Sequence, residues 1–284
     1  MQLVAAAIQM PAAPMRVVEN LERADVLLRR AQQSGAELLV LPEMFNTGYG
    51  SSPDYAPVAE DLQGPTLRLL RERCREGNVA IAAGFVERCG SHIYDALAFC
   101  SPDGQVEIYR KRHLVFWECS KFRKGIEPLI VSTRWGRIGF AICADMIYRR
   151  VWRDYRDRID LAIISAAWPD FADRRSGRPH WLLGRLGPLC GEIPRMVAQD
   201  LGIPVIFANQ CGETETRVPA QPRILDRFAG RSSLCDGRHA LPVKAGIEEA
   251  IVIAPLTLSP VRGSSQCHSM SPSASTGSSS MSPV

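Results

Sequence analysis

The sequence predicts an α/β protein built on a mixed β-sheet. Short apolar runs alternate with segments of helical periodicity, and two of the runs are joined by a tight turn. Strand–helix–strand units produce parallel strand pairs, and a tight turn produces an antiparallel pair, so we expect both kinds of pairing. No repeat of fixed period is present.

The first predicted unit is a strand, a helix and a second strand. Residues 3–9 form a short apolar run that prolines end, which is typical of a buried strand. Apolar residues then recur every three or four positions over residues 17–31, as in an amphipathic helix, and Gly35 ends the pattern. Residues 38–41 are wholly apolar, which indicates a strand buried on both faces.

A second helix and three strands follow. Residues 65–76 begin with a proline and end before Gly-Asn, which favours a helix. Residues 79–86 form an apolar run, which predicts a buried strand. Residues 93–100 and 106–109 flank the turn Ser-Pro-Asp-Gly at 101–104, so we expect a hairpin.

The second half of the chain repeats the alternation. Three apolar runs predict strands, and helical periodicity predicts a helix directly after the first run. A longer helical stretch follows, with a break at Gly187-Pro188. The predicted strands are residues 138–142, 161–164 and 205–208, and the predicted helices are residues 146–159 and 181–201.

The composition is that of an ordinary globular protein, with 46% apolar and 23% charged residues. The net charge of +4 is spread along the chain, which argues against a nucleic-acid partner. No apolar run approaches the ~20 residues of a membrane span, and the N-terminus lacks the features of a signal peptide. We therefore expect neither a nucleic-acid nor a membrane partner.

The last 24 residues form a different kind of segment. Residues 261–284 contain ten serines and almost no large apolar residues. Such a composition cannot bury enough apolar surface to offset the entropy of ordering, so we expect a disordered tail.

The cysteines argue for a reducing compartment. The chain has nine, an odd number, scattered singly and with no Cys-x-x-Cys pair. Without a secretory signal, this usage favours reduced thiols and a cytoplasmic protein.

Three reactive side chains each follow an apolar strand. Glu43 follows residues 38–41, Lys111 follows residues 106–109, and Cys143 follows residues 138–142. Ligands of α/β proteins gather beyond the carboxyl ends of the strands, so these three side chains are expected to converge.

Their chemistry is complementary. A free thiol is only a few per cent thiolate at neutral pH, and a carboxylate within hydrogen-bond reach can take its proton. An ammonium nearby stabilises both the thiolate and a tetrahedral oxyanion. Together they make an acyl-transfer site that needs neither metal nor cofactor, and no metal-binding or nucleotide-binding motif occurs in the sequence.

The sequence around these residues resembles the three motif blocks of the nitrilase superfamily of carbon–nitrogen hydrolases. The blocks are Leu-Pro-Glu-Met-Phe at 41–45 with Gly48-Tyr49, Tyr-Arg-Lys-Arg-His-Leu at 109–114, and Gly-Phe-Ala-Ile-Cys-Ala-Asp at 139–145. Supporting matches occur at 165–169, 207–210 and 227–232. The resemblance covers residues 3–258, so we expect a carbon–nitrogen hydrolase domain over residues 1–260.

The resemblance implies a four-layer α-β-β-α sandwich with two mixed sheets, paired into homodimers or larger homo-oligomers. It implies Glu43 as general base, Lys111 as oxyanion stabiliser and Cys143 as nucleophile, with the backbone N–H of Ala144 as a second oxyanion donor. Glu118 resembles a second glutamate that many amidase members use to orient the substrate and the lysine.

Ala144 also bears on the substrate. True nitrilases typically carry Cys-Trp-Glu at the nucleophile, whereas this chain has Cys-Ala-Asp at 143–145. The resemblance therefore favours hydrolysis of a small-molecule amide or N-carbamoyl compound. Tyr49 and Trp168 lie in matching blocks and are expected to contact the substrate.

A carboxylate on the substrate would need a cationic clamp. Arg149-Arg150 follow the nucleophile, and Arg174-Arg175 occupy a polar stretch after the block at 165–169. Either pair could bind a carboxylate bidentately, as an N-carbamoyl amino acid or an ω-amide requires.

Three other functions remain open from the sequence. The protein could hydrolyse nitriles, or it could use Cys143 with His113 as a thiol–imidazole pair. It could also be an inactive binding or scaffold member of the same fold, although the intact Glu43, Lys111 and Cys143 argue against this.

Overall fold

The computed structural model describes residues 1–173, 178–179, 183–216, 224–237 and 242–259. The expected tail at 261–284 and the Arg174-Arg175 pair lie outside the described residues. Within them, none of the helices combines the length and apolarity that a transmembrane span requires.

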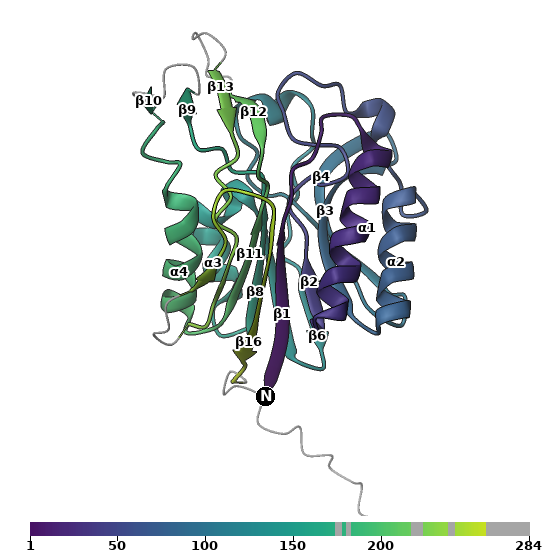
Figure 1. Cartoon of the computed structure of the whole chain (residues 1–284), viewed down its shortest axis with the longest axis vertical. Helices are drawn as coiled ribbons and strands as arrows, with labels where there is room; N and C mark the ends of the chain where they lie inside the picture. Colours follow the sequence, from purple (N-terminus) through teal and green to yellow (C-terminus); the bar gives the residue numbers. More distant parts are fainter. Residues whose placement is uncertain (174–177, 180–182, 217–223, 238–241, 260–284) are drawn as a thin grey trace, which may run out of the picture.

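Two mixed sheets face each other, and helices cover the outer face of each (Figure 1), which confirms the expected α-β-β-α sandwich. In the order of its strands, the first sheet contains β16 (Ala250–Thr257), β1 (Gln2–Gln9), β2 (Leu38–Val40), β3 (Ala80–Cys89), β4 (His92–Cys100) and β5 (Val106–Arg110). The second contains β15 (Val243–Lys244), β14 (Ser233–Cys235), β11 (Val205–Asn209), β8 (Leu161–Ala166), β7 (Gly136–Ile142) and β6 (Ile130–Thr133).

The helices lie on opposite outer faces of the sandwich. On the first sheet pack α1 (Val17–Gln33) and α2 (Pro65–Gly77), and on the second pack α3 (Arg149–Tyr155) and α4 (Leu189–Leu201). Short 3₁₀ turns are η1 (Ala56–Val58), η2 (Phe116–Ser120) and η3 (Cys143–Ile147). Two hairpins extend beyond the sheets, one of β9 (Ala172–Asp173) with β10 (Arg178–Pro179) and one of β12 (Glu213–Thr216) with β13 (Ile224–Arg227).

The central strands are apolar on both faces because each face meets a different layer. In β1, Leu3 and Ala5 belong to the core between the two sheets. Ala6 and Ile8 belong to the core under α1 and α2. Full burial of a leucine or isoleucine contributes about 1.5–3 kcal/mol, so the alternation fixes which face of β1 meets which layer.

The predicted strands and the first two helices are confirmed, with ends that differ by at most a few residues. The hairpin across residues 101–104 is also confirmed, since β4 and β5 pair antiparallel. In the second sheet, β7, β8 and β11 are parallel neighbours, as strand–helix–strand units require.

The prediction of one helix over residues 146–159 was wrong. Instead, the 3₁₀ turn η3 follows the strand, Tyr148 has extended backbone, and α3 ends at Tyr155. The Tyr155 hydroxyl donates to the Phe140 carbonyl at 2.8 Å, which ties the end of α3 to β7. Asp157 then has a positive φ of 61°, so the chain leaves the helix to enter β8.

The second long helix also begins later than predicted. Residues 183–188 form turns, and α4 starts after Pro188, while residues 181–182 lie outside the described part. The last strand, β16, was not predicted, because Pro255 interrupts its apolar pattern. Proline is tolerated there since β16 is an edge strand that pairs with β1 alone.

The sheet order brings three strand ends to one end of the sandwich. In the first sheet, β2 and β3 are parallel, and β5 returns to the same direction through the β3–β4–β5 meander. The loops after β2 and β5 therefore leave the sheet on the same side. In the facing sheet, β7 ends in η3, and β5 contacts β7 across the sandwich.

Gly84 on β3 supports the loop after β2 by direct backbone contact. A Cβ at Gly84 would lie 2.5 Å from the Cα of Glu43 and 2.9 Å from the Met44 nitrogen. The Phe45 N–H donates to the Gly84 carbonyl at 3.0 Å. Any side chain at this position would therefore displace Glu43.

We predict that Gly84→Ala lowers the free energy of unfolding by about 1–3 kcal/mol, the usual cost of overpacking. Urea unfolding would measure it. Gly246→Ala is the matched control, because a Cβ there meets nothing within 4 Å. Equal unfolding midpoints for the two variants would contradict the close approach of Gly84 and Glu43.

Candidate active site

Glu43 stands in the loop after β2 and is fully buried. Its Oε1 contacts the Lys111 Nζ at 2.6 Å, and its Oε2 accepts from the Ala167 N–H at 2.6 Å. The Gln210 side chain donates to the Glu43 carbonyl at 2.7 Å. Ala167 and Gln210 belong to two of the supporting sequence blocks, so these blocks serve to hold Glu43.

Lys111 follows β5 and is also fully buried. Its Nζ lies 2.6 Å from Glu43 Oε1, 2.6 Å from Glu118 Oε1 and 3.1 Å from Asp95 Oδ2. Burial alone would lower the pKa of Lys111, but the three carboxylates outweigh it and raise the pKa well above its ordinary value. The side chain is therefore a permanent ammonium.

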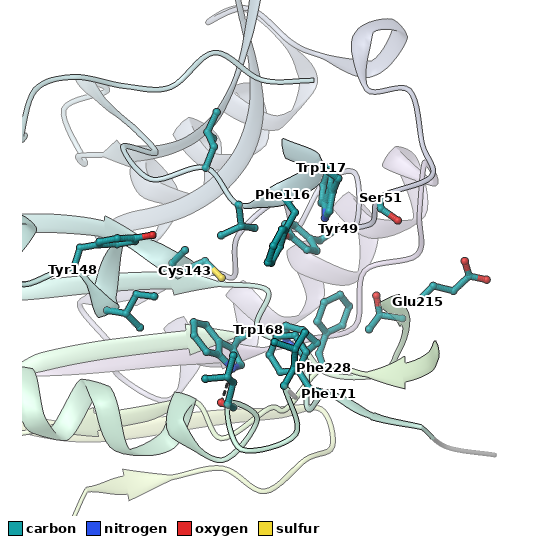
Figure 2. A pocket seen from close by; sticks show the side chains of 18 residues that line it. Tyr49, Ser51, Phe116, Trp117, Cys143, Tyr148, Trp168, Phe171, Glu215 and Phe228 are labelled. Carbon is teal, nitrogen blue, oxygen red and sulfur yellow. Dashed lines mark hydrogen bonds between the residues drawn. The ribbon is translucent and has the colours of Figure 1, made fainter. Parts of the chain in front are cut away.

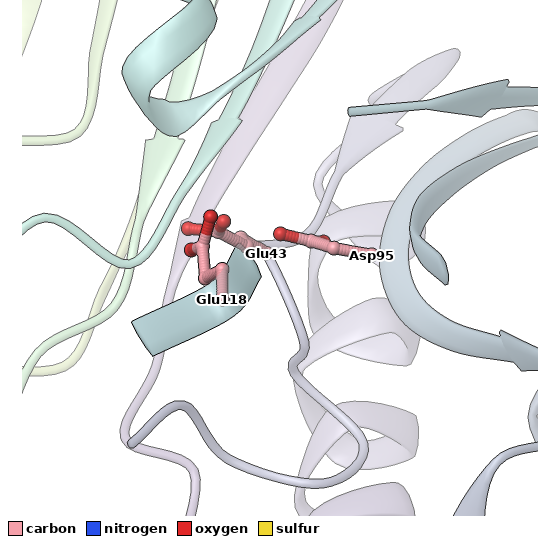
Figure 3. Close-up of side chains that lie close together, drawn as sticks. All are labelled: Glu43, Asp95 and Glu118. Atoms are coloured by element: carbon pink, nitrogen blue, oxygen red, sulfur yellow. The ribbon is translucent and has the colours of Figure 1, made fainter. Parts of the chain in front are cut away.

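The three carboxylates converge on this ammonium. Figure 3 shows Glu43 and Glu118 side by side, with Asp95 directed toward them, and their oxygens lie within 4.8 Å of one another. Clusters of this kind hold cations. The cation that they surround is the ammonium of Lys111.

Glu118 lies in η2 and accepts three hydrogen bonds. Its Oε1 accepts from Lys111 and from the Tyr49 hydroxyl at 2.7 Å, and its Oε2 accepts from the Val115 N–H at 2.9 Å. Burial raises the pKa of Glu118, against the effect of Lys111. The three donors fix the carboxylate and orient Lys111 between Glu118 and Glu43.

Asp95, on β4, was missed from the sequence. It is fully buried, and neither carboxylate oxygen has a hydrogen-bond partner among the described residues besides its ion pair with Lys111. The sequence feature that could have identified Asp95 is its position as the one acidic residue in the largely apolar run of residues 93–100. Buried acids need a partner, so such a residue points to a cation nearby.

Cys143 stands where β7 ends and η3 begins, as predicted. Its backbone has a φ of 45°, in the left-handed region that L-residues rarely adopt. Strained backbone of this kind is stored at functional sites when the surrounding structure enforces it. The thiol is 5% exposed and lines a cavity.

Asp145 holds the turn that carries Cys143. Its carboxylate accepts from the Ile142 N–H at 3.2 Å, the Tyr109 hydroxyl at 2.8 Å and the His113 N–H at 2.8 Å. These donors come from both sheets and the loop after β5. Asp145 thereby ties the turn to the segment that carries Lys111.

The Cys143 thiol is protonated at rest. Its pKa is raised well above the ordinary value, first by burial and then by the Glu43 carboxylate, while Lys111 opposes the shift. A thiol in this state needs a base to become a nucleophile. Glu43 is the carboxylate with the largest effect on it.

His113 is engaged elsewhere. Its Nδ1 contacts Asp145 Oδ1 at 2.7 Å, its Nε2 accepts from the Arg150 Nε–H at 2.6 Å, and its ring stacks on Tyr148. With both ring nitrogens bonded, His113 does not serve Cys143 as a base in this geometry.

The cavity beside Cys143 has a volume of about 410 Å³. Figure 2 shows Tyr148, Trp168 and Phe116 around the sulfur. The expected substrate-contact residues Tyr49, Ala144 and Trp168 all line this cavity. The eight cysteines among the described residues have free thiols, and of these eight Cys143 lines the cavity.

The first arginine pair is not in the cavity wall. Arg149 and Arg150 are exposed at the start of α3, and Arg150 donates to His113. Neither lines the cavity, so the geometry does not support a carboxylate clamp made by this pair.

Comparison with known proteins identifies the family of this chain. The family model for carbon-nitrogen hydrolase matches residues 4–264. The omega-amidase NIT2 of Bos taurus is 28% identical over 253 residues, which cover 84% of this chain and 83% of the relative. A nitrilase of Pyrococcus abyssi is 31% identical over 46% of this chain and 51% of its own length.

Solved structures share the fold. XC1258 from Xanthomonas campestris, a CN-hydrolase superfamily protein, superposes with a TM-score of 0.74 at 23% identity and covers 90% of this chain and 91% of its own. An amidase from Nesterenkonia sp. AN1 in complex with butyramide has a TM-score of 0.72 at 22% identity, covering 89% and 90%. With a family model that spans nearly the whole chain, this protein belongs to the carbon-nitrogen hydrolase family.

Proposed function

We propose that this protein hydrolyses an amide or N-carbamoyl group of a small molecule through a thioester on Cys143. The observation that carries the proposal is the buried contact of Glu43 with Lys111 behind a thiol that opens onto a cavity. The name omega-amidase of the Bos taurus relative supports it. So does a mutant of the Nesterenkonia amidase that shows covalent addition of the acetamide moiety of fluoroacetamide at its active-site cysteine.

In the first half of the cycle, the Cys143 sulfur attacks the substrate carbonyl carbon while Glu43 takes the thiol proton. The carbonyl π bond becomes an oxyanion, stabilised by the Lys111 ammonium and the Ala144 N–H. The oxyanion then collapses, the carbon–nitrogen bond breaks, and Glu43 gives its proton to the departing ammonia or amine. The product of this half is the thioester.

The second half uses water. Glu43 removes a proton from water as its oxygen attacks the thioester carbonyl, and the same donors hold the second oxyanion. Its collapse breaks the carbon–sulfur bond, and the proton returns from Glu43 to the thiolate. Glu118 keeps Lys111 in place throughout, because its Oε1 accepts from the ammonium, and the Tyr49 hydroxyl donates to the same oxygen.

Two further expectations stay predictions. The family resemblance implies a homodimer or larger homo-oligomer, which light scattering would measure. The free thiols of the described residues support a reducing, cytoplasmic compartment.

We predict that Cys143→Ala lowers ammonia release by at least about 1,000-fold, because no other cysteine of the described residues lines the cavity. The assay covers amides, ω-amides, N-carbamoyl amino acids and nitriles. Cys89→Ala is the control, since Cys89 is an exposed thiol at the end of β3. Retained hydrolysis in Cys143→Ala would rule the mechanism out, and turnover of nitriles alone would favour the nitrilase alternative.

We also predict that Lys111→Met destabilises the fold by about 3–5 kcal/mol at neutral pH, the usual cost of unpairing buried charges. Without the ammonium, the pKa of Glu118, already raised by burial, rises further above its unfolded value. The folded state then binds more protons than the unfolded state, so the variant loses stability as the pH rises from about 4 to 8. Urea unfolding across this range measures it, and a pH-independent difference from wild type would contradict the charge assignment.

A further inference from the structure

The wall of the cavity is aromatic on several sides. Trp168, Tyr148 and Phe116 surround the sulfur in Figure 2, and Phe171 and Phe228 continue the wall away from it. These side chains come from separate segments of the chain, so the cavity is formed by the tertiary fold. Ala144, next to the nucleophile, leaves the space between them open.

The charges around the cavity are unfavourable for an anion. Of the described residues that line it, none is an arginine or a lysine, and Glu215 lies at its outer, exposed end. A substrate carboxylate would lose its hydration against aromatic surface, which costs several kcal/mol when no partner replaces the water. An apolar group gains free energy from the same transfer.

From this wall we propose that the substrate is a neutral amide whose acyl group is apolar and about the size of a phenylalkyl group. The inference rests on the proposed function, since it assumes that the substrate carbonyl sits at Cys143. A cavity of about 410 Å³ accommodates such an acyl group and lies within the usual range of small-molecule sites. This preference separates the protein from an enzyme that acts on ω-amides, which carry one free carboxylate besides the amide.

The test compares three primary amides: 3-phenylpropionamide with an aromatic acyl group, butyramide with a short apolar one and succinamate with an anionic one. We expect kcat/KM for 3-phenylpropionamide to exceed that for either of the others by at least about 10-fold, because burial of a phenyl ring is worth this much. Equal or better hydrolysis of succinamate would overturn the inference and leave the proposed function intact. Ammonia release from none of the three, nor from N-carbamoyl compounds, would overturn both.

A variant of Phe116 tests whether the aromatic cavity wall causes the preference for an apolar acyl group. Phe116 lines the cavity and is 64% exposed, so truncating it removes apolar contact without opening the core. Phe116→Ala should lower the ratio of kcat/KM for 3-phenylpropionamide to that for butyramide about fivefold. Ile126→Ala, at an exposed apolar residue outside the cavity, should leave this ratio unchanged. An unchanged ratio in Phe116→Ala would count against recognition of the acyl group by this wall.

Asp95 has fewer hydrogen-bond donors around it than the other two carboxyl groups of the cluster. Glu118 accepts from three donors, and Glu43 accepts from Lys111 and Ala167. Asp95 has only one such neighbour, the Lys111 Nζ at 3.1 Å from its Oδ2, although it is fully buried. One ammonium cannot balance three buried carboxylates, so a proton resides on the one with the fewest donors.

We infer that Asp95 is a neutral positioning residue that donates its proton in a hydrogen bond to Glu43. The charged and titratable groups that face Asp95 are Glu43 after β2, Lys111 after β5, Glu118 in η2 and Tyr55 just before η1, with Tyr49 and Cys143 beyond them. The pKa of Asp95 is raised well above its ordinary value, by burial first and by Glu43 next, with Lys111 opposing. The neutral acid limits the negative charge near Cys143, which would otherwise disfavour the thiolate further.

The Asp95→Asn variant distinguishes a neutral hydrogen-bond donor at this position from an ionised partner of Lys111. Asp95→Ala should lower kcat at least about 10-fold with little change in KM, because Glu43 loses a donor. Asp95→Asn should recover most of the loss, since an amide is uncharged and can donate. In wild type, kcat/KM should also fall at alkaline pH as Asp95 loses its proton, and the Asn variant should lack that decline.

The opposite results are informative. If Asp95→Asn is as damaging as Asp95→Ala, the negative charge itself is needed and Asp95 is ionised. If both variants resemble wild type in kcat and in pH profile, Asp95 has no part in positioning Glu43. Thermal unfolding of both variants distinguishes lost positioning from lost stability.

Discussion

The structure depends on one buried ammonium. Lys111 is the point at which the loop after β2, strand β4, the end of β5 and the turn η2 all meet, through three carboxyl groups that lie 2.6–3.1 Å from its ammonium. Burying these charges is expensive, and replacing such networks with apolar residues is often neutral or stabilising in other proteins. The network is therefore better explained by the chemistry proposed at Cys143 than by stability. Its geometric consequence is that Glu43, Lys111 and Glu118 cannot shift independently.

The strands and most residues of the candidate site could be predicted from the sequence, because the patterns that mark them lie within a few residues of one another. A reactive residue directly after an apolar run indicates the end of a strand, and Glu43, Lys111 and Cys143 all follow such a run. Asp95 does not follow such a run, because its partner is set by the pairing of β4 with β5 and not by its neighbours in the chain. The helix after Cys143 was overestimated for a similar reason. Its periodicity is helical, but the tie of Tyr155 to Phe140 ends α3 early.

In the proposed function, catalysis and substrate recognition use different parts of the site. The polar cluster lies behind the thiol and is held by hydrogen bonds from several sequence blocks, whereas the cavity in front is an aromatic surface. A change in the aromatic wall alters which acyl group fits and leaves the carboxylates and the ammonium in place. This division agrees with a family in which the fold is shared at 22–23% identity with the solved structures. It also explains why motifs identify the chemistry but not the substrate.

The pairing of the first strand with the last has a consequence for synthesis on the ribosome. β1 lies inside the first sheet, between β2 and β16, and Gln9 donates to backbone carbonyls of Gly246 and Glu248. One edge of β1 therefore stays uncovered until residues 250–257 have left the exit tunnel. At about 5–20 residues per second, some 240 residues of further synthesis leave that edge open for about 12–50 s. During this interval a nascent chain exposes an apolar strand edge to neighbouring chains, which makes chaperone binding at the N-terminal strand valuable for this fold.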